Sequence, residues 1–185
     1  MKFSRKEIFD LVKAWVIISF AFAIVFKSAG DVFVNIVLMS LVTVGAGFLL
    51  HELAHKFVAQ HFGVWAEFRS NDQMLLLALV MSFFGFVFAA PGGVWMPKLS
   101  KNKEGLVSLA GPLTNILLAI LFFVCNFFYV STWFSFGMYI NSFLAIFNLI
   151  PFPGFDGRTV FDWNKIVWGI SILITGIFLY LPRLI

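Results

Sequence analysis

The chain has 185 residues, of which 61% are hydrophobic and only 12% are charged. A mean hydropathy of +0.97 lies far outside the range of soluble proteins, and several apolar runs are long enough to span a bilayer. We therefore expect an all-α polytopic membrane protein that forms one domain over residues 1–185. The net charge of +4 comes from scattered basic residues, which excludes a nucleic-acid partner and favours basic cytoplasmic loops. The single cysteine, Cys125, excludes an internal disulfide and a cysteine-based zinc site.

The N-terminal segment predicts a membrane anchor that is retained. Residues 11–26 are apolar, slightly short for a span, and show no small-residue cleavage site. Lys2, Arg5 and Lys6 precede this run. The positive-inside rule therefore places the N-terminus in the cytoplasm.

Residues 32–62 predict one long helix that carries the most distinctive motif of the chain. Its segment His-Glu-Leu-Ala-His, at residues 51–55, matches the pattern H-E-x-x-H. His51 and His55 are four residues apart, so they share one face of a helix, and Glu52 lies next to any ion that they bind. The pattern is typical of a zinc site with two imidazole ligands and a carboxylate as general base. Ionisable groups are costly in an apolar span, which favours a functional site.

The motif lies in the last third of this helix, which we expect to end at Gly63. With the N-terminus in the cytoplasm, the predicted site therefore lies toward the cytoplasmic face of the membrane.

The segment 64–104 allows two topologies. Residues 64–73 alternate in a way that allows a strand, and residues 74–90 are apolar and about as long as a helix. If this apolar run crosses the membrane, the three lysines between residues 98 and 103 lie outside, against the positive-inside rule. The charge bias favours a short re-entrant or β-hairpin segment, and a full crossing is the alternative.

Three further helices follow, which brings the prediction to about five to six transmembrane helices. Residues 105–130 form a clear span, and a short outer turn is expected at 131–136. Residues 137–157 form the next core helix, whose span ends near residue 152 at the segment Pro-Phe-Pro-Gly-Phe-Asp-Gly. The final span covers residues 166–181.

Catalytic zinc usually takes three protein ligands, and Asp156 is the candidate that the later part of the chain offers. It follows a long uncharged stretch and lies in a turn where Pro151 and Pro153 stop helix continuation. Unwound backbone at membrane depth is tolerated where it is buried in protein or lines a wet cavity, so this carboxylate can point at a metal on a neighbouring helix. An N-cap aspartate that starts the last helical segment is the alternative.

Other ionisable residues are weaker candidates. His61 lies ten residues after His51, which turns it about 280° around the helix. The remaining acidic residues lie in polar loops or at a membrane edge, where they need no special explanation: Glu67, Asp72, Glu104 and Asp162.

Four motifs in a fixed order resemble a known family. The histidine motif at 51–55 is followed by Pro-Gly-Gly at 91–93, Ala-Gly-Pro-Leu-Thr-Asn at 110–115 and Asn-Leu-Ile-Pro-Phe-Pro-Gly-Phe-Asp-Gly at 148–157. Together they resemble the site-2 protease family of intramembrane zinc metalloproteases over most of the chain. Phe155 departs from the leucine that the family often has before Asp-Gly.

The resemblance implies one Zn²⁺ per chain and a complete site. Its residues are the metal ligands His51, His55 and Asp156, the general base Glu52, and two polar groups near the metal, Asn115 and Asn148. Either asparagine could hydrogen-bond the substrate backbone or the oxyanion, or could instead form an interhelical hydrogen bond.

The resemblance also implies what the protein does. It implies a zinc endopeptidase that hydrolyses peptide bonds in or near transmembrane helices of membrane-protein substrates. The chain would be a multi-pass protein of the cell membrane, surrounded by lipid. An edge strand from residues 64–73 or 86–97 could bind an unwound substrate by strand addition.

Two competing interpretations remain. The prenyl-protein type of membrane metalloprotease uses a downstream intramembrane glutamate as its third ligand, and this sequence has none after Glu52. A non-proteolytic zinc-binding membrane protein, either a transporter or an inactive protease homologue, is the alternative outside that class. A transporter would be expected to spread ionisable residues over several spans or to show inverted repeats.

Overall fold

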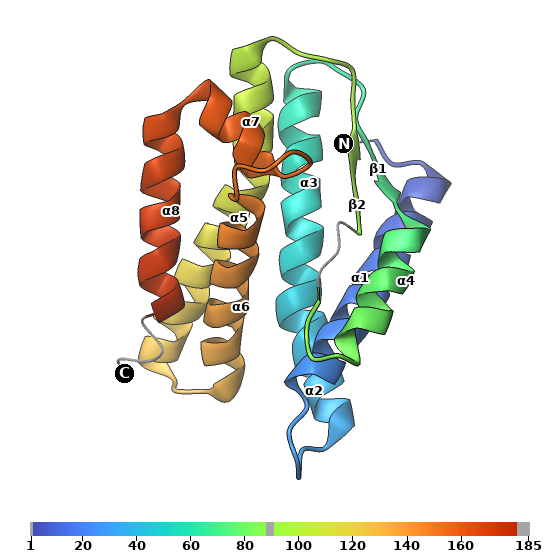
Figure 1. The fold of residues 1–185 in the computed structure, drawn as a ribbon, viewed down its shortest axis with the longest axis vertical. Coiled ribbons are helices and arrows are strands. Elements are labelled where there is room, and N and C mark those ends of the chain that lie inside the picture. The colour runs from blue at the N-terminus through green and yellow to red at the C-terminus, as the bar shows by residue number, and fades with distance from the viewer. Residues whose placement is uncertain (1, 88–90, 181–185) are drawn as a thin grey trace.

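The computed structural model describes residues 2–87 and 91–180, and most of them are helical (Figure 1). The helical elements are α1 (Arg5–Phe26), α2 (Phe33–Ser40), the π-helical turn η1 (Leu41–Gly45), α3 (Ala46–His61), α4 (Asp72–Ser82), α5 (Lys101–Phe128), α6 (Thr132–Asn148), α7 (Asp156–Trp163) and α8 (Lys165–Tyr180). The strands β1 (Glu67–Ser70) and β2 (Gly92–Trp95) form one small antiparallel sheet. The helical membrane-protein class predicted from the sequence is confirmed.

Three helical segments within the described part of the chain are long and apolar enough to cross a membrane. They are Arg5–Phe26, Phe33–His61 and Lys101–Phe128. Helix α6 has 17 residues and α8 has 16, so both are shorter than a typical span of about 20 residues. The predicted final span reaches residue 181, which lies outside the described residues.

Helix α3 stands in the middle of the molecule (Figure 1). Helices α5, α6 and α8 lie on one side of it, and α1, α4 and the two strands lie on the other. Helix α5 packs along both α3 and α6, while α7 packs across α5. Because α3 contacts both halves, a side chain on α3 can meet groups from either half.

The predicted helix over residues 32–62 is one continuous helical run with a π-helical turn in it. A π turn leaves backbone groups without their usual i→i−4 partners, and the Trp15 Nε1–H donates to the Leu41 carbonyl oxygen at 3.0 Å. Gly63 follows the helix with φ of +78°, a conformation that glycine adopts without steric cost. The run therefore ends where the sequence predicted.

The segment between α3 and α5 leaves the small sheet and returns to it. In this sheet Glu67 pairs with Trp95 and Ser70 with Gly92, and just beyond them the Asn71 N–H donates to the Pro91 carbonyl oxygen at 2.8 Å. Both ends of the intervening chain thus meet at one place, which agrees with the predicted re-entrant or β-hairpin segment and not with a full crossing. The apolar run predicted over 74–90 ends its helix at Ser82, and its residues 88–90 lie outside the described part.

Several helix boundaries differ from the prediction. The core helix predicted over 137–157 ends at Asn148, and the span predicted over 105–130 begins at Lys101. At two other boundaries a serine cap decides where the helix begins. Helix α1 begins at Arg5, where the sequence predicted residue 11, since the Ser4 hydroxyl accepts from the Glu7 N–H at 3.1 Å. Helix α6 begins at Thr132 because Ser131 caps it, so the predicted outer turn over 131–136 is almost wholly helical. Hydropathy marks the apolar centre of a helix but passes over its polar first turn.

Candidate metal centre

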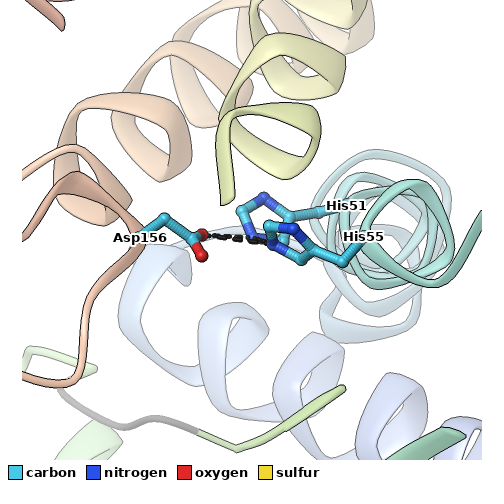
Figure 2. Close-up of side chains that lie close together, drawn as sticks. All are labelled: His51, His55 and Asp156. Atoms are coloured by element: carbon cyan, nitrogen blue, oxygen red, sulfur yellow. Dashed lines mark hydrogen bonds and ion pairs between the residues drawn. The ribbon is translucent and has the colours of Figure 1, made fainter. Parts of the chain in front are cut away.

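His51 and His55 lie one turn apart on α3 and point toward the same place (Figure 2). Their Nε2 atoms are 3.0 Å apart, and both side chains are buried. The helix that carries them is apolar and buried against α5, so their chemistry takes place inside the protein. The i, i+4 spacing thus produces the shared face that the sequence predicted.

Asp156 reaches the same place from the other half of the molecule. Helix α6 ends at Asn148, and the turn that follows includes Gly154 with φ of +93°. A Cβ on Gly157 would collide with the Leu149 backbone, so only glycine allows the turn to close against the end of α6. Asp156 is the first residue of α7, and its Oδ2 lies 3.2 Å from the Nε2 atoms of both histidines. The carboxylate therefore meets the imidazoles rather than capping the helix.

The three donor atoms fit a zinc ion. The distances between them are 3.0, 3.2 and 3.2 Å. Ligand atoms in a tetrahedral site with bond lengths of about 2.0–2.1 Å lie roughly 3.3 Å apart, so small shifts would complete the geometry. Two imidazoles and one carboxylate are a common catalytic zinc donor set that leaves a fourth position open. The donor set supports Zn²⁺ as the cofactor.

Both histidines are held through the ring nitrogen that faces away from this point. The His55 Nδ1 lies 2.7 Å from the Val107 carbonyl oxygen, and the His51 Nδ1 lies 2.6 Å from the Asn115 Oδ1. Each partner is an oxygen that accepts, so each Nδ1 carries the hydrogen and each Nε2 keeps its lone pair. Outer partners of this kind orient metal-binding imidazoles.

Gly111 lets α5 approach the two imidazoles. A Cβ built on it would collide with the Nε2 atoms of both His51 and His55. Any larger residue would therefore fill the place where the donor atoms converge. The predicted motif at 110–115 thus has a steric role that the sequence did not reveal.

Glu52 lies beside the donor atoms and is the unusual member of the site. It is 8% exposed, and its Oε2 is buried without a hydrogen-bond partner among the described residues. An unsatisfied buried carboxylate oxygen costs free energy and needs an explanation. A role for Glu52 in accepting a proton from a water or a substrate would explain it.

A cavity of about 290 Å³ opens over the site. Its walls come from α1, α3, β2, α5, α6 and the turn before α7. Glu52 and Asp156 line it, together with apolar side chains such as Phe48 and Phe147. The cavity has room for several waters or for a short stretch of extended peptide.

The two predicted asparagines differ in their surroundings. Asn115 is fully buried, borders the cavity and bonds the His51 Nδ1. Asn148 is half-buried, donates to the Leu144 carbonyl oxygen at 2.9 Å within its own helix, and lines the cavity. Asn148 is therefore the one with an accessible amide, and a substrate-binding role stays a prediction for both.

The weaker candidates lie elsewhere. His61 is exposed at the end of α3, and Asp162 is exposed and paired with Arg158 on α7. Sequence reasoning missed the Val107 carbonyl, the steric role of Gly111, and Asn141, which contacts Asn115. The Gly-Pro pair in a predicted span was a signal for close helix approach. A backbone carbonyl is present in every residue, so its role cannot be predicted from residue type.

Together, the fold and the site define a helical membrane protein whose H-E-x-x-H motif and an aspartate form a group that could hold a metal ion. Two curated proteins, both named "Putative zinc metalloprotease", are similar to the chain. MJ0611 of Methanocaldococcus jannaschii is 39% identical over 189 residues, which covers 97% of this chain and 96% of that protein. YwhC of Bacillus subtilis is 26% identical over 146 residues, which covers 66% of this chain and 67% of that protein.

The chain belongs to this zinc metalloprotease family. No family model matches it. No solved structure matches it either.

Proposed function

We propose that the protein is an intramembrane zinc endopeptidase of the site-2 protease type, which cleaves peptide bonds in or near transmembrane helices of other membrane proteins. One observation carries the proposal. Two histidines and an aspartate converge inside a membrane-type helix bundle, next to a buried carboxylate oxygen of Glu52 that has no partner among the described residues. The resemblance of the four sequence motifs to the site-2 protease family supports it, as does the family to which the chain belongs.

In the proposed reaction the two histidines and Asp156 hold the metal through Nε2 and Oδ2 atoms. Zinc bound in such a site acts as a Lewis acid that makes a water more acidic and polarises a carbonyl. Glu52 accepts the proton of the attacking water and returns it to the leaving amine. The Glu52 Oε2 has no hydrogen-bond partner among the described residues, so it is available to accept that proton.

The orientation in the membrane follows from the charges. Figure 1 shows the N-terminus, the loop before α5 and α7 at the same end of the molecule. Most basic residues lie in these segments or at the adjoining starts of α1, α5 and α8: Lys2, Arg5, Lys6, Lys98, Lys101, Lys103, Arg158 and Lys165. The positive-inside rule predicts that this end faces the cytoplasm. The histidines lie on α3, the second half of the helical run Phe33–His61, and α3 ends at this end of the molecule (Figure 1). Water would then reach the site from the cytoplasmic face of a multi-pass protein of the cell membrane.

The substrate would bind as an extended strand, because the peptide bonds of a helix are shielded. Strand β2 pairs with β1 on one edge, and its residues Gly92, Gly93 and Val94 line the cavity. Strand addition to the cavity-facing edge of β2 would place a peptide bond beside Glu52. Proline at Gly93 or at Val94 would remove the N–H that faces the substrate, since consecutive residues of a strand point their N–H groups in opposite directions. Strand addition predicts that one of the two variants loses cleavage, and unchanged cleavage in both would contradict it.

The central experiment is cleavage of a single-span membrane protein by the full chain in proteoliposomes. The wild type should cleave, and a zinc chelator should stop it. Glu52→Gln should lose at least about 10²–10⁴-fold in rate, the usual contribution of a general base, while retaining one zinc per chain. Full activity in Glu52→Gln would remove the mechanism. Bound zinc without any cleavage by the wild type would instead favour the inactive homologue or the transporter.

A further inference from the structure

A chain of side-chain amides reaches from α6 through α5 to the metal centre. The Asn141 Nδ2 donates to the Gly137 carbonyl oxygen at 2.9 Å, and its Oδ1 accepts from the Asn115 Nδ2 at 3.1 Å. The same Asn115 Nδ2 lies 3.2 Å from the Gly47 carbonyl oxygen, and the Asn115 Oδ1 lies 2.6 Å from the His51 Nδ1. Both asparagines are fully buried. Three helices thus contribute to one network behind His51.

The direction of every hydrogen bond in this network is fixed by backbone. A carbonyl oxygen only accepts, so Gly137 must face the NH₂ of Asn141, and Gly47 must face the NH₂ of Asn115. Each amide oxygen is then turned the other way. The Asn141 oxygen accepts from Asn115, and the Asn115 oxygen is left to accept from His51.

This direction determines the tautomer of His51. Because the Asn115 oxygen can only accept, the His51 Nδ1 must donate, and the Nε2 keeps the lone pair that a metal requires. Reversing the Asn115 amide would place two oxygens, those of Asn115 and Gly47, against each other. Neither the wrong tautomer nor a turned ring is therefore compatible with the network.

Gly47 makes the network possible. A Cβ built on it would collide with the Asn141 Oδ1, the atom that accepts from Asn115. Gly47 lies on α3, one turn before His51, so the close approach of α6 occurs directly behind the ligand. In an apolar bundle such buried amides are costly unless every donor and acceptor is paired, which favours a fully connected network.

We propose that Asn115 and Asn141 are positioning residues that hold His51 in its metal-binding orientation and tautomer, with Gly47 as the residue that admits them. The inference rests on the proposed zinc site but not on peptide cleavage. It assigns to Asn115 an interhelical role behind the ligand rather than a contact with the substrate. Asn141, which lies on α6, acts on His51 only through Asn115.

The test measures zinc affinity by competition with a chromophoric chelator, and ligand geometry by the visible spectrum of the cobalt-substituted protein. All variants are made in the full chain carrying Glu52→Gln, so that the readout does not depend on peptidase activity. Asn115→Ala should weaken zinc binding by about 10–100-fold, the usual cost of losing an outer partner of a metal ligand. Asn141→Leu and Gly47→Ala should weaken it by a smaller factor and change the cobalt spectrum in the same way.

Asn141→Asp provides the rescue. A buried carboxylic acid stays neutral, donates to the Gly137 carbonyl and accepts from Asn115, so zinc affinity should stay within about threefold of the parent. Ser142→Ala is the matched control, because Ser142 is equally buried on α6 but bonds only the Met138 carbonyl of its own helix. It should leave affinity and spectrum unchanged.

Two results would overturn the inference. One is a zinc affinity equal to that of the Glu52→Gln parent in both Asn115→Ala and Asn141→Leu. The other is an equal loss in Ser142→Ala or in Asn141→Asp, which would show that zinc binding responds to any disturbance of α6. If Asn115→Ala does not fold, Asn141→Leu and Asn141→Asp still test the inference. Weaker zinc binding in Asn141→Leu alone supports it, and equal zinc binding in the two variants overturns it.

Discussion

Two buried polar clusters meet on α3 at consecutive residues. His55 belongs to the metal centre, and Lys56 belongs to an ion pair with Glu7 of α1. Lys56 is 1% exposed and Glu7 is fully buried, so both clusters lie in the interior. They face different sides of the helix, the metal centre toward α5 and the ion pair toward α1 and β1.

The ion pair is complete in itself. Lys56 bonds one oxygen of Glu7, and the other oxygen accepts from the Phe68 N–H at 2.9 Å. The ring of Phe3 lies 4.1 Å from the Lys56 Nζ. The pairing of both charges shows why this cluster can hold α1, α3 and β1 together without any further group.

The metal centre is different, because it includes a buried carboxylate oxygen that no described residue satisfies. Three donor atoms point at one place, and the Glu52 Oε2 has no partner among the described residues. The comparison teaches that burial of charge alone does not mark a functional site. What marks it is burial together with unpaired polar atoms beside a cavity.

The largest effect should come from Asp156→Asn. Loss of a carboxylate ligand should weaken zinc binding by more than the 10–100-fold that outer partners contribute, and should abolish cleavage. Asp162→Asn on the same helix is the matched control, since Asp162 is exposed and contacts Arg158. Metal analysis and the proteoliposome assay check both. Equal zinc content in the two variants would contradict the assignment of Asp156 as a ligand.

Gly111→Ala should damage the metal centre and leave the ion pair intact. The added methyl group would occupy the place where the histidine Nε2 atoms meet, so we expect zinc affinity to fall by at least about tenfold, or 1.4 kcal/mol. Gly169→Ala on α8 meets nothing within 4 Å and should bind zinc normally. Chelator competition measures both variants, and normal binding in Gly111→Ala would show that α5 can move aside.

Breaking the ion pair should lower the stability of the fold and leave zinc binding unchanged. Lys56→Met or Glu7→Gln alone leaves a buried charge without its partner, and each should lower the free energy of unfolding by about 3–5 kcal/mol. The double variant should recover most of this loss because no lone charge remains. Unfolding in mixed micelles gives the stabilities, and zinc should stay at one per chain. A double variant as unstable as either single one would mean that packing, rather than charge, holds this cluster.

The smallest effect concerns acid stability at the rim of the ion-pair cluster. The Ser4 hydroxyl donates to the Glu67 carboxylate, and together with Arg69 it holds the pKa of Glu67 below its ordinary value. The folded pKa is lower than the unfolded one, so this stabilisation is present above the unfolded pKa and is lost as pH falls through the folded pKa.

Glu67→Gln should therefore be less stable than the wild type at neutral pH, with a difference that shrinks in acid. Unfolding measured across pH checks this. A difference that does not change with pH would show that the charge of Glu67 contributes nothing.

The sequence by itself predicted the membrane class, the long helix with its histidine motif, and the re-entrant segment. These depend on local properties, namely hydropathy, the i, i+4 spacing of His51 and His55, and the charge of flanking loops. It also singled out Asp156, because an aspartate beside two prolines in an apolar region has few ordinary explanations. Helix ends were less certain, since the serine caps at Ser4 and Ser131 lie outside the apolar pattern.

Only the tertiary structure decided what surrounds the motif. The Val107 carbonyl, the space left by Gly111 and the amides of Asn115 and Asn141 come from other helices, and their roles depend on how closely those helices pack. The same holds for Lys56, which the sequence places next to a ligand and the structure turns toward Glu7. Residue type and spacing determine which groups share a face of one helix, but the partners that bond them are chosen by packing between helices.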